Sequence, residues 1–236
     1  FWDGKHVKTI SVDNGVLSNN VNCILADSKN RYWFGTNDGL NLLSDGELKD
    51  LNTENGLCNN EVQTIFEDSK GNIWLGTLSG LARYDDKALR NFDEKDGLID
   101  KTVYTITEDK FGKIWIGTFG GGIYSYSEKN GRSTFKRMLT EDDVLSNNIY
   151  SIGYNEGKNQ LIVGTDKGAS VITLNHDGSC VNKINNFVKN NGFIAQETNL
   201  NALLVEKDKL FFGTNSGLTL IDLENLKSSV NETPLH

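Results

Sequence analysis

The sequence predicts an all-β protein built from repeated four-stranded units, and two observations carry this prediction. A motif of three apolar residues followed by Gly-Thr recurs five times along the chain. Its successive glycines are 41, 41, 47 and 49 residues apart, at Gly35, Gly76, Gly117, Gly164 and Gly213. A period in the forties, with turn signals between short apolar segments, is typical of a β-propeller, in which each repeat forms one blade.

The first repeat contains the strands of one blade in order. Alternating apolar residues predict strands at 21–25, 32–36, 40–43 and 47–51. Polar turns separate these strands, at 27–30, at 37–39 and at Asp45-Gly46, the last of which is a hairpin signal. Four short strands joined by tight turns make one blade.

The same pattern predicts five blades in a single propeller domain of residues 1–230. Gly15, Gly56 and Gly97 each precede a valine by six residues, which sets the register of the first three repeats. The fourth strand of the last blade, near residues 226–230, is serine-rich and weak. The blades are expected at about 14–52, 55–93, 96–138, 143–188 and 192–230.

Residues 1–12 match the outer strand of a blade that has no other strands in this chain, because residues 6–10 alternate between polar and apolar. We expect this strand to complete the last blade and to close the ring, which would remove exposed sheet edges. The alternative is that the chain is a piece of a larger ring.

Composition excludes several classes of function. The net charge is −8 and the basic residues are scattered, so we expect no nucleic-acid partner. No apolar run is long enough to span a bilayer, and no signal-peptide pattern opens the chain. Because the sequence begins at Phe1, we expect a processed form or an excised fragment. Cys23, Cys58 and Cys180 show no CxxC spacing, and we expect buried or half-buried thiols, with a single disulfide as the alternative.

The repeated motif itself is expected to be scaffold. Trp33, Trp74 and Trp115 lie two residues before the motif glycine, where the other repeats carry Ile162 and Phe211. A position that accepts Trp, Ile or Phe fills space between blades and does not recognise one ligand. The motif glycines suit a crowded point in a strand, and the threonines after them are expected to hydrogen-bond within the following turn.

The segment Asp68–Thr77 (DSKGNIWLGT), followed by Gly80–Asp85 (GLARYD), resembles the two-component regulator propeller repeat, as does Asp109–Thr118 (DKFGKIWIGT). The resemblance covers nearly the whole chain. It is strong over residues 13–126 and weaker in repeats four and five, which lack the Trp and the Asp-to-Gly turn.

The resemblance implies the periplasmic or extracellular sensor part of a membrane-anchored receptor, such as a histidine kinase, a hybrid kinase or a diguanylate cyclase. Such propellers are commonly seven-bladed, and many sense oligosaccharides. Residues 231–236 then lead towards an immunoglobulin-like domain. That domain, a neighbouring propeller and a second copy of the receptor are the macromolecular partners that the resemblance implies.

No catalytic, metal or cofactor site is predicted. His6, His176 and His236 lie far apart in sequence and have no metal-ligand spacing. The Asp-to-Trp element differs from the Asp-box of sialidases, and positions present in five copies do not suit catalysis, which needs unique residues. A carbohydrate-active lyase or hydrolase remains the alternative, since many propellers host such sites, and a protein-interaction scaffold is a third interpretation.

A binding site is expected on the face formed by the turns between second and third strands and by the connectors between blades. These segments carry short amides, hydroxyls and carboxylates that suit the hydroxyls of an oligosaccharide or of another small ligand. Phe119, flanked by three glycines, is expected to stack on a sugar face. The alternative is that the Asn residues simply cap turns. The candidate residues are Asn19, Asn20, Asn37, Asp38, Asn59, Asn60, Phe119, Asn147, Asn148, Asp166 and Asn215.

Overall fold

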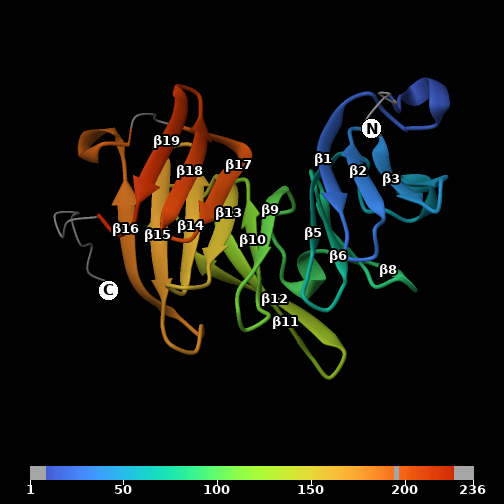
Figure 1. Cartoon of the computed structure of the whole chain (residues 1–236). Helices are drawn as coiled ribbons and strands as arrows, with labels where there is room; N and C mark the ends of the chain where they lie inside the picture. The colour runs from blue at the N-terminus through green and yellow to red at the C-terminus, as the bar shows by residue number, and fades with distance from the viewer. Residues whose placement is uncertain (1–8, 194–196, 226–236) are drawn as a thin grey trace. The chain divides into compact units, whose positions relative to one another are not determined.

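The computed structural model describes residues 9–193 and 197–225, which form consecutive antiparallel sheets (Figure 1). The regular structure of these residues consists of strands and short 3₁₀ helices. The prediction of an all-β protein made of propeller blades is confirmed. The chain divides into two compact units, Phe1–Asn91 and Phe92–His236.

Unit 1 contains two four-stranded sheets, each with its strands in sequence order. The predicted strands of the first blade are reproduced to within one residue at each end. Blade 1 consists of β1 (Val21–Ala26), β2 (Tyr32–Thr36), β3 (Gly39–Ser44) and β4 (Glu47–Leu51). Blade 2 consists of β5 (Val62–Glu67), β6 (Ile73–Thr77), β7 (Gly80–Tyr84) and β8 (Leu89–Phe92), whose last residue begins unit 2.

Unit 2 contains the remaining sheets, two with four strands and one with three among its described residues. Blade 3 consists of β9 (Val103–Glu108), β10 (Ile114–Thr118), β11 (Ile123–Lys129) and β12 (Arg132–Leu139). Blade 4 consists of β13 (Ile149–Asn155), β14 (Gln160–Thr165), β15 (Gly168–Leu174) and β16 (Val181–Phe187). Blade 5 consists of β17 (Thr198–Glu206), β18 (Lys209–Thr214) and β19 (Gly217–Asp222).

The predicted closure by an N-terminal strand falls mainly outside the described residues. Residues 1–8 and the expected fourth strand near 226–230 both lie there, as does the exit segment 231–236. Thr9 and Ile10, the described end of the N-terminal segment, are not part of a strand.

Each of the three tryptophans of the motif is buried and hydrogen-bonded to an aspartate six residues earlier. Trp115 is 0% exposed, and its indole Nε1 donates to Asp109 Oδ2 at 2.9 Å. The other oxygen of Asp109 accepts backbone N–H bonds from Phe111 and Lys113, at 2.9 and 3.1 Å. One carboxylate therefore closes the β9–β10 turn and also satisfies a buried indole. The prediction that the tryptophans are core residues is confirmed.

The same carboxylate arrangement is found in both blades of unit 1. Trp33 Nε1 donates to Asp27 at 2.9 Å, and Trp74 Nε1 donates to Asp68 at 2.8 Å. Burial alone would raise the pKa of Asp27, but hydrogen bonds from Trp33 and Arg31 outweigh it and lower the pKa. The sequence predicted this aspartate only as part of a polar turn. Its hydrogen bond to the indole was not predicted and is seen in the structure.

The motif threonines close the turn that follows them, as predicted. Each hydroxyl donates to the carbonyl of a glycine at the start of the third strand or, in blade 3, just before it, at 2.7 to 3.0 Å. In four blades that glycine is three residues beyond the threonine. In blade 3 Thr118 bonds to Gly122, four residues on, because the β10–β11 loop is one residue longer. The threonines that make these bonds are Thr36, Thr77, Thr118, Thr165 and Thr214.

The connectors between blades contain short 3₁₀ helices, which the sequence did not predict. They are η1 (Val12–Asn14), η2 (Thr53–Asn55), η3 (Glu94–Asp96) and η4 (Lys189–Asn191). Gly15, Gly56 and Gly97 end the first three with φ values of 110°, 114° and 97°. Glycine adopts this left-handed conformation without the steric penalty that a Cβ atom brings.

The motif glycine lets the first strand of the next blade pass close to the second strand of its own blade. A Cβ atom on Gly117 would lie 2.6 Å from Ile149 Cγ2 of β13, and one on Gly35 would lie 2.8 Å from Val62 Cγ1 of β5. Around this crossing in unit 2, Trp115 packs in one buried cluster with Ile149 and Leu161 of blade 4. The core of each unit thus lies between successive sheets.

All three cysteines are free. Cys23 and Cys58 are half-buried, and burial raises the pKa of Cys23 to about 12. The expectation for Cys180 is wrong: this residue is exposed, because it lies in the turn between β15 and β16.

We expect Asp109→Ala to lower the free energy of unfolding by about 1–3 kcal/mol, because the buried indole N–H of Trp115 loses its acceptor. Asp142→Ala is the control, since this exposed carboxylate should change stability by no more than about 0.5 kcal/mol. Urea unfolding followed by circular dichroism measures both. Equal stability of the two variants would show that the Asp–Trp bond adds nothing.

We also expect Gly117→Ala to destabilise unit 2 by roughly 1–3 kcal/mol, because the new methyl group overlaps Ile149 and Thr105. Gly157→Ala is the matched control: its Cβ would meet only Asn155 Oδ1 at 3.6 Å. The same unfolding measurement compares them, and a well-tolerated Gly117→Ala would contradict the close crossing of β10 and β13.

Candidate functional site

Three aromatic side chains of unit 2 form a row, here called the aromatic row, at the start of β9 and β13. These two are the inner strands, meaning the first strands, of blades 3 and 4. Tyr104 is the second residue of β9, Tyr150 is the second residue of β13, and Phe119 lies in the β10–β11 loop. The ring centroids of Tyr104 and Phe119 are 5.8 Å apart, and those of Tyr104 and Tyr150 are 6.1 Å apart. Phe119 is 48% exposed and both tyrosines are partly exposed, so the row is open to a ligand.

Two carboxylates and an amide lie beside this row. Asn148 Nδ2 donates to Asp166 Oδ2 at 2.8 Å, while Asp166 Oδ1 is buried and has no hydrogen-bond partner within the described residues. The Glu197 carboxylate lies near enough to the Tyr150 hydroxyl to affect its pKa. Burial, together with the negative charges of Glu197 and Asp166, raises the pKa of Tyr150. The site therefore joins apolar ring surface to acceptors that can take further hydrogen bonds.

The loop that carries Phe119 is held in place by three contacts. Phe119 N donates to Thr102 O at 2.9 Å, and Arg137 Nε donates to Gly121 O at 2.6 Å. A Cβ atom on Gly121 would overlap the side chain of Asp100. Asp100 in turn accepts a hydrogen bond from the Tyr124 hydroxyl at 2.7 Å. The loop is thus closely packed at Gly121 and Gly122, whereas a Cβ atom on Gly120 would meet nothing within 4 Å.

Four of the candidate asparagines are engaged in shaping the connectors. Asn19 and Asn60 each accept a backbone N–H bond from the first residue of a 3₁₀ helix, at 3.1 and 2.8 Å. Asn147 accepts the backbone N–H of Glu141, at the equivalent position of the next connector, at 2.8 Å. Asn59 accepts the N–H of Glu61 at 2.9 Å. At these four positions the side-chain oxygen therefore caps a turn, which was the alternative to ligand binding.

The remaining candidates divide between the two units. In unit 1, Asn37 Oδ1 accepts a bond from Asn22 at 2.8 Å, and Asn20 and Asp38 are exposed. In unit 2, Asn215 is exposed and its Oδ1 accepts a bond from Ser216. Phe119, Asn148 and Asp166 are the candidates that lie at the aromatic row.

The site prediction did not include Tyr104, Tyr150 or Glu197. A sequence signal existed for the tyrosines, because each directly follows the apolar residue that begins the inner strand. Blades 1 and 2 carry the polar residues Asn22 and Gln63 at that position. The change from polar to aromatic therefore marks blades 3 and 4 as different.

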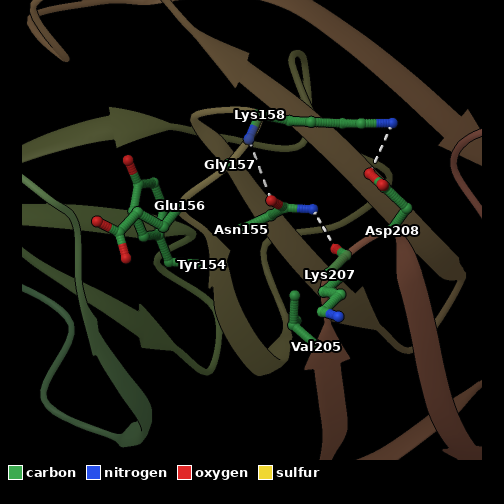
Figure 2. A pocket seen from close by; sticks show the side chains of 8 residues that line it. All are labelled: Tyr154, Asn155, Glu156, Gly157, Lys158, Val205, Lys207 and Asp208. Atoms are coloured by element: carbon green, nitrogen blue, oxygen red, sulfur yellow. Dashed lines mark hydrogen bonds and ion pairs between the residues drawn. The ribbon is translucent and has the colours of Figure 1, made fainter.

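A separate groove of about 550 Å³ lies between the β13–β14 and β17–β18 turns, at the other end of these strands (Figure 2). Asn155 Nδ2 donates to Lys207 O at 2.6 Å, and the Lys158 ammonium pairs with Asp208 at 2.8 Å. Figure 2 shows Asn155 between the two turns and Lys158 reaching across to Asp208. Because these polar groups join the two turns, the groove is a weaker candidate than the aromatic row.

Within residues 9–193 and 197–225, no group of three or more His, Cys, Asp and Glu side chains is arranged to hold a metal ion. In the same part of the chain, no helix has both the length and the apolar character needed to cross a bilayer.

The model of the family described as two component regulator propeller matches residues 15–38, 56–79 and 97–120. These are the three segments that run from the end of a connector helix to the turn after the second strand. They are therefore repeats of this family. A search of curated proteins finds no match to the chain.

The chain is similar in structure to the extracellular domain of the hybrid two component system BT3049 from B. thetaiotaomicron, with a TM-score of 0.73 and 20% identity. It is also similar to PorZ, a surface component of the type-IX secretion system of Porphyromonas gingivalis, with a TM-score of 0.70 and 17% identity. These matches cover 98% and 94% of this chain, but 34% and 35% of the two larger chains.

A third similar structure is virginiamycin B lyase from Staphylococcus aureus, with a TM-score of 0.57 and 17% identity over 84% of this chain and 68% of the lyase. An extracellular domain of a two component system, a secretion component and an enzyme thus share the fold. At these identities the likeness shows the β-propeller fold and not the function.

We predict that Tyr124, beneath the Phe119 loop, makes stability depend on pH in the alkaline range. Burial and the neighbouring Asp100 carboxylate raise the pKa of Tyr124 from 10.0 to about 12. Below pH 10 this tyrosine is protonated in folded and unfolded chains alike. Between pH 10 and about 12 only the unfolded chain loses the proton, so the free energy of unfolding falls as the pH rises.

Urea unfolding at about pH 9 and about pH 11 should therefore show a smaller loss of stability for Tyr124→Phe than for the original chain. Comparing the two proteins cancels the other groups that titrate in this range. Identical losses would contradict the raised pKa.

Proposed function

Because residues 15–38, 56–79 and 97–120 are two component regulator propeller repeats, we propose that the chain is part of a ligand-sensing propeller of a bacterial membrane receptor. The similarity to the extracellular domain of a hybrid two component system supports a place outside the cytoplasm. The observation that carries the proposal is the aromatic row of Phe119, Tyr104 and Tyr150 beside the Asp166 and Glu197 carboxylates.

The proposed ligand is an oligosaccharide. One face of a pyranose ring presents C–H groups that pack on aromatic side chains, and Phe119 offers such a surface. The hydroxyl groups around the sugar both donate and accept hydrogen bonds, which matches the amide of Asn148 and the open oxygen of Asp166. The same site thus meets both the apolar face and the polar edge of a sugar.

We infer that binding occurs without catalysis. A glycosidase needs a carboxyl group that an apolar setting keeps protonated, so that it can donate to the leaving group. Asp166 instead accepts a bond from Asn148, and Glu197 lies beside the Tyr150 hydroxyl. Neither carboxylate therefore lies in the wholly apolar setting that such an acid needs. A carbohydrate-active enzyme and a protein-interaction scaffold are the alternatives.

The signal requires that the ligand bind two arrangements of the full receptor with different affinity. The Phe119 loop is fixed by Thr102, Arg137 and Asp100, so the difference is not expected within this loop. A neighbouring propeller, an immunoglobulin-like domain or a second receptor copy would supply the second surface.

Titration calorimetry against a panel of oligosaccharides, with the products checked for cleavage, tests this proposal. We expect binding without turnover, and we expect Phe119→Ala to weaken it at least tenfold, about 1.4 kcal/mol. Phe111→Ala is a matched control, because Phe111 is also 48% exposed but lies in the β9–β10 turn, at the other end of the strands.

Cleavage of a bound sugar would point to the enzyme instead. Equal loss of affinity in both phenylalanine variants would contradict the location of the site. Absence of binding across the panel would contradict the oligosaccharide itself.

A further inference from the structure

The carboxylates of the aromatic row have no cation of their own. Neither Asp166 nor Glu197 forms an ion pair in the part of the chain that the structure describes. Of the basic residues in the adjoining segments, Arg137 binds Gly121 O and Lys101 pairs with Glu94 at 3.0 Å. Lys167, next to Asp166 in the chain, is exposed and forms no ion pair with either carboxylate among the described residues. Two negative charges thus stand beside the rings without a counter-charge in contact.

One oxygen of the Asp166 carboxylate is also buried. Asp166 Oδ2 is occupied by Asn148, but Asp166 Oδ1 is shielded from solvent and has no donor among the described residues. An ionised carboxylate oxygen without a donor costs free energy, which a ligand that donates to it would recover. A charged donor recovers more than a neutral one, because charge-assisted hydrogen bonds are about twice as strong.

The aromatic rings favour the same kind of ligand. The face of a tyrosine or phenylalanine ring carries negative charge and attracts an ammonium group placed over it. Tyr104 lies between Phe119 and Tyr150, and the Glu197 carboxylate lies near the Tyr150 hydroxyl. The rings and the carboxylates thus lie in the same region of the surface, and both kinds of group contribute negative potential there.

We propose that this site selects ligands that carry a protonated primary amine, and among oligosaccharides an amino sugar whose amine is free. The inference rests on the proposed sugar-binding function and adds the charge of the ligand to it. An ammonium group has three donors and no acceptor, which suits the open Asp166 oxygen, the Glu197 carboxylate and a ring face.

Three β-1,4-linked tetrasaccharides that differ only at carbon 2 test the inference. The tetramer of glucosamine carries an ammonium group there, the tetramer of N-acetylglucosamine an acetamide, and cellotetraose a hydroxyl. Calorimetry at a pH where the amine is protonated should give at least tenfold tighter binding for glucosamine than for either neutral tetramer. Added salt should reduce this preference, because it screens the charges.

Two variants examine the carboxylates themselves. Glu197→Gln and Asp166→Asn keep the side-chain shape and should remove most of the preference, so that the glucosamine tetramer no longer binds at least tenfold more tightly than the neutral tetramers. The control is Glu156→Gln, which removes the same charge from an exposed residue at the other end of β13. It should keep the preference, so that general attraction of a cation to a chain of net charge −8 is distinguished from the site.

Cellotetraose binding as tightly as the glucosamine tetramer, with both lost in Phe119→Ala, would overturn this inference and leave the sugar-binding proposal intact. A preference that survives Glu197→Gln and Asp166→Asn, or that Glu156→Gln weakens equally, would also overturn it. Failure of all three tetramers to bind would overturn the inference and the proposed function together.

Discussion

The hydrogen bond from a buried indole to an aspartate six residues earlier is the constraint on which blades 1, 2 and 3 depend. The aspartate closes a hairpin through backbone N–H bonds, and its second oxygen receives the tryptophan N–H. The tryptophan fills the space beside the next sheet in unit 2, where Trp115 lies among residues of blade 4. Local turn geometry and packing between sheets are therefore coupled through one carboxylate. A tryptophan without that acceptor would bury an unpaired donor.

This coupling explains why the functional candidates are departures from the repeat. Residues that the blades share are used by the fold: the threonine hydroxyl closes a turn and the glycine admits the next strand. The connector asparagine of blades 1, 2 and 4 likewise accepts a backbone N–H of its own connector. What is left for a ligand is what one blade has and its neighbours lack. Phe119 lies in the β10–β11 loop, which is one residue longer than its equivalents, and Tyr104 and Tyr150 are the second residues of the first strands of blades 3 and 4.

The strands followed from the sequence because the alternation of apolar residues and the repeated Gly-Thr pair are local signals. The 3₁₀ helices did not, since three residues are too few to show a helical period, although the glycines that end them were visible. Asn19, Asn60 and Asn147 were predicted as ligand contacts, yet each accepts a backbone N–H in its own connector. Sequence alone does not say whether an asparagine oxygen faces its own backbone or solvent.

Tyr104 and Tyr150 were missed for a different reason. The site was predicted in turns and connectors, whereas each tyrosine is the second residue of a strand. Which strand residues meet at the end of a sheet depends on how successive blades pack. The contact between Tyr104 of β9 and Tyr150 of β13 joins residues from two different sheets. No spacing within a single repeat encodes such a contact.

The fixed loop beneath Phe119 bears on how a signal could arise. Thr102, Arg137 and Asp100 hold the loop before any ligand arrives, so that binding loses little conformational entropy at this point. Such preorganisation favours affinity but leaves the loop without a second conformation to select. A ligand changes an equilibrium only through different affinity for two states. If this site senses, the second state must differ in what lies next to the row of rings, and a ligand that spans the row and that neighbour would be the one that signals.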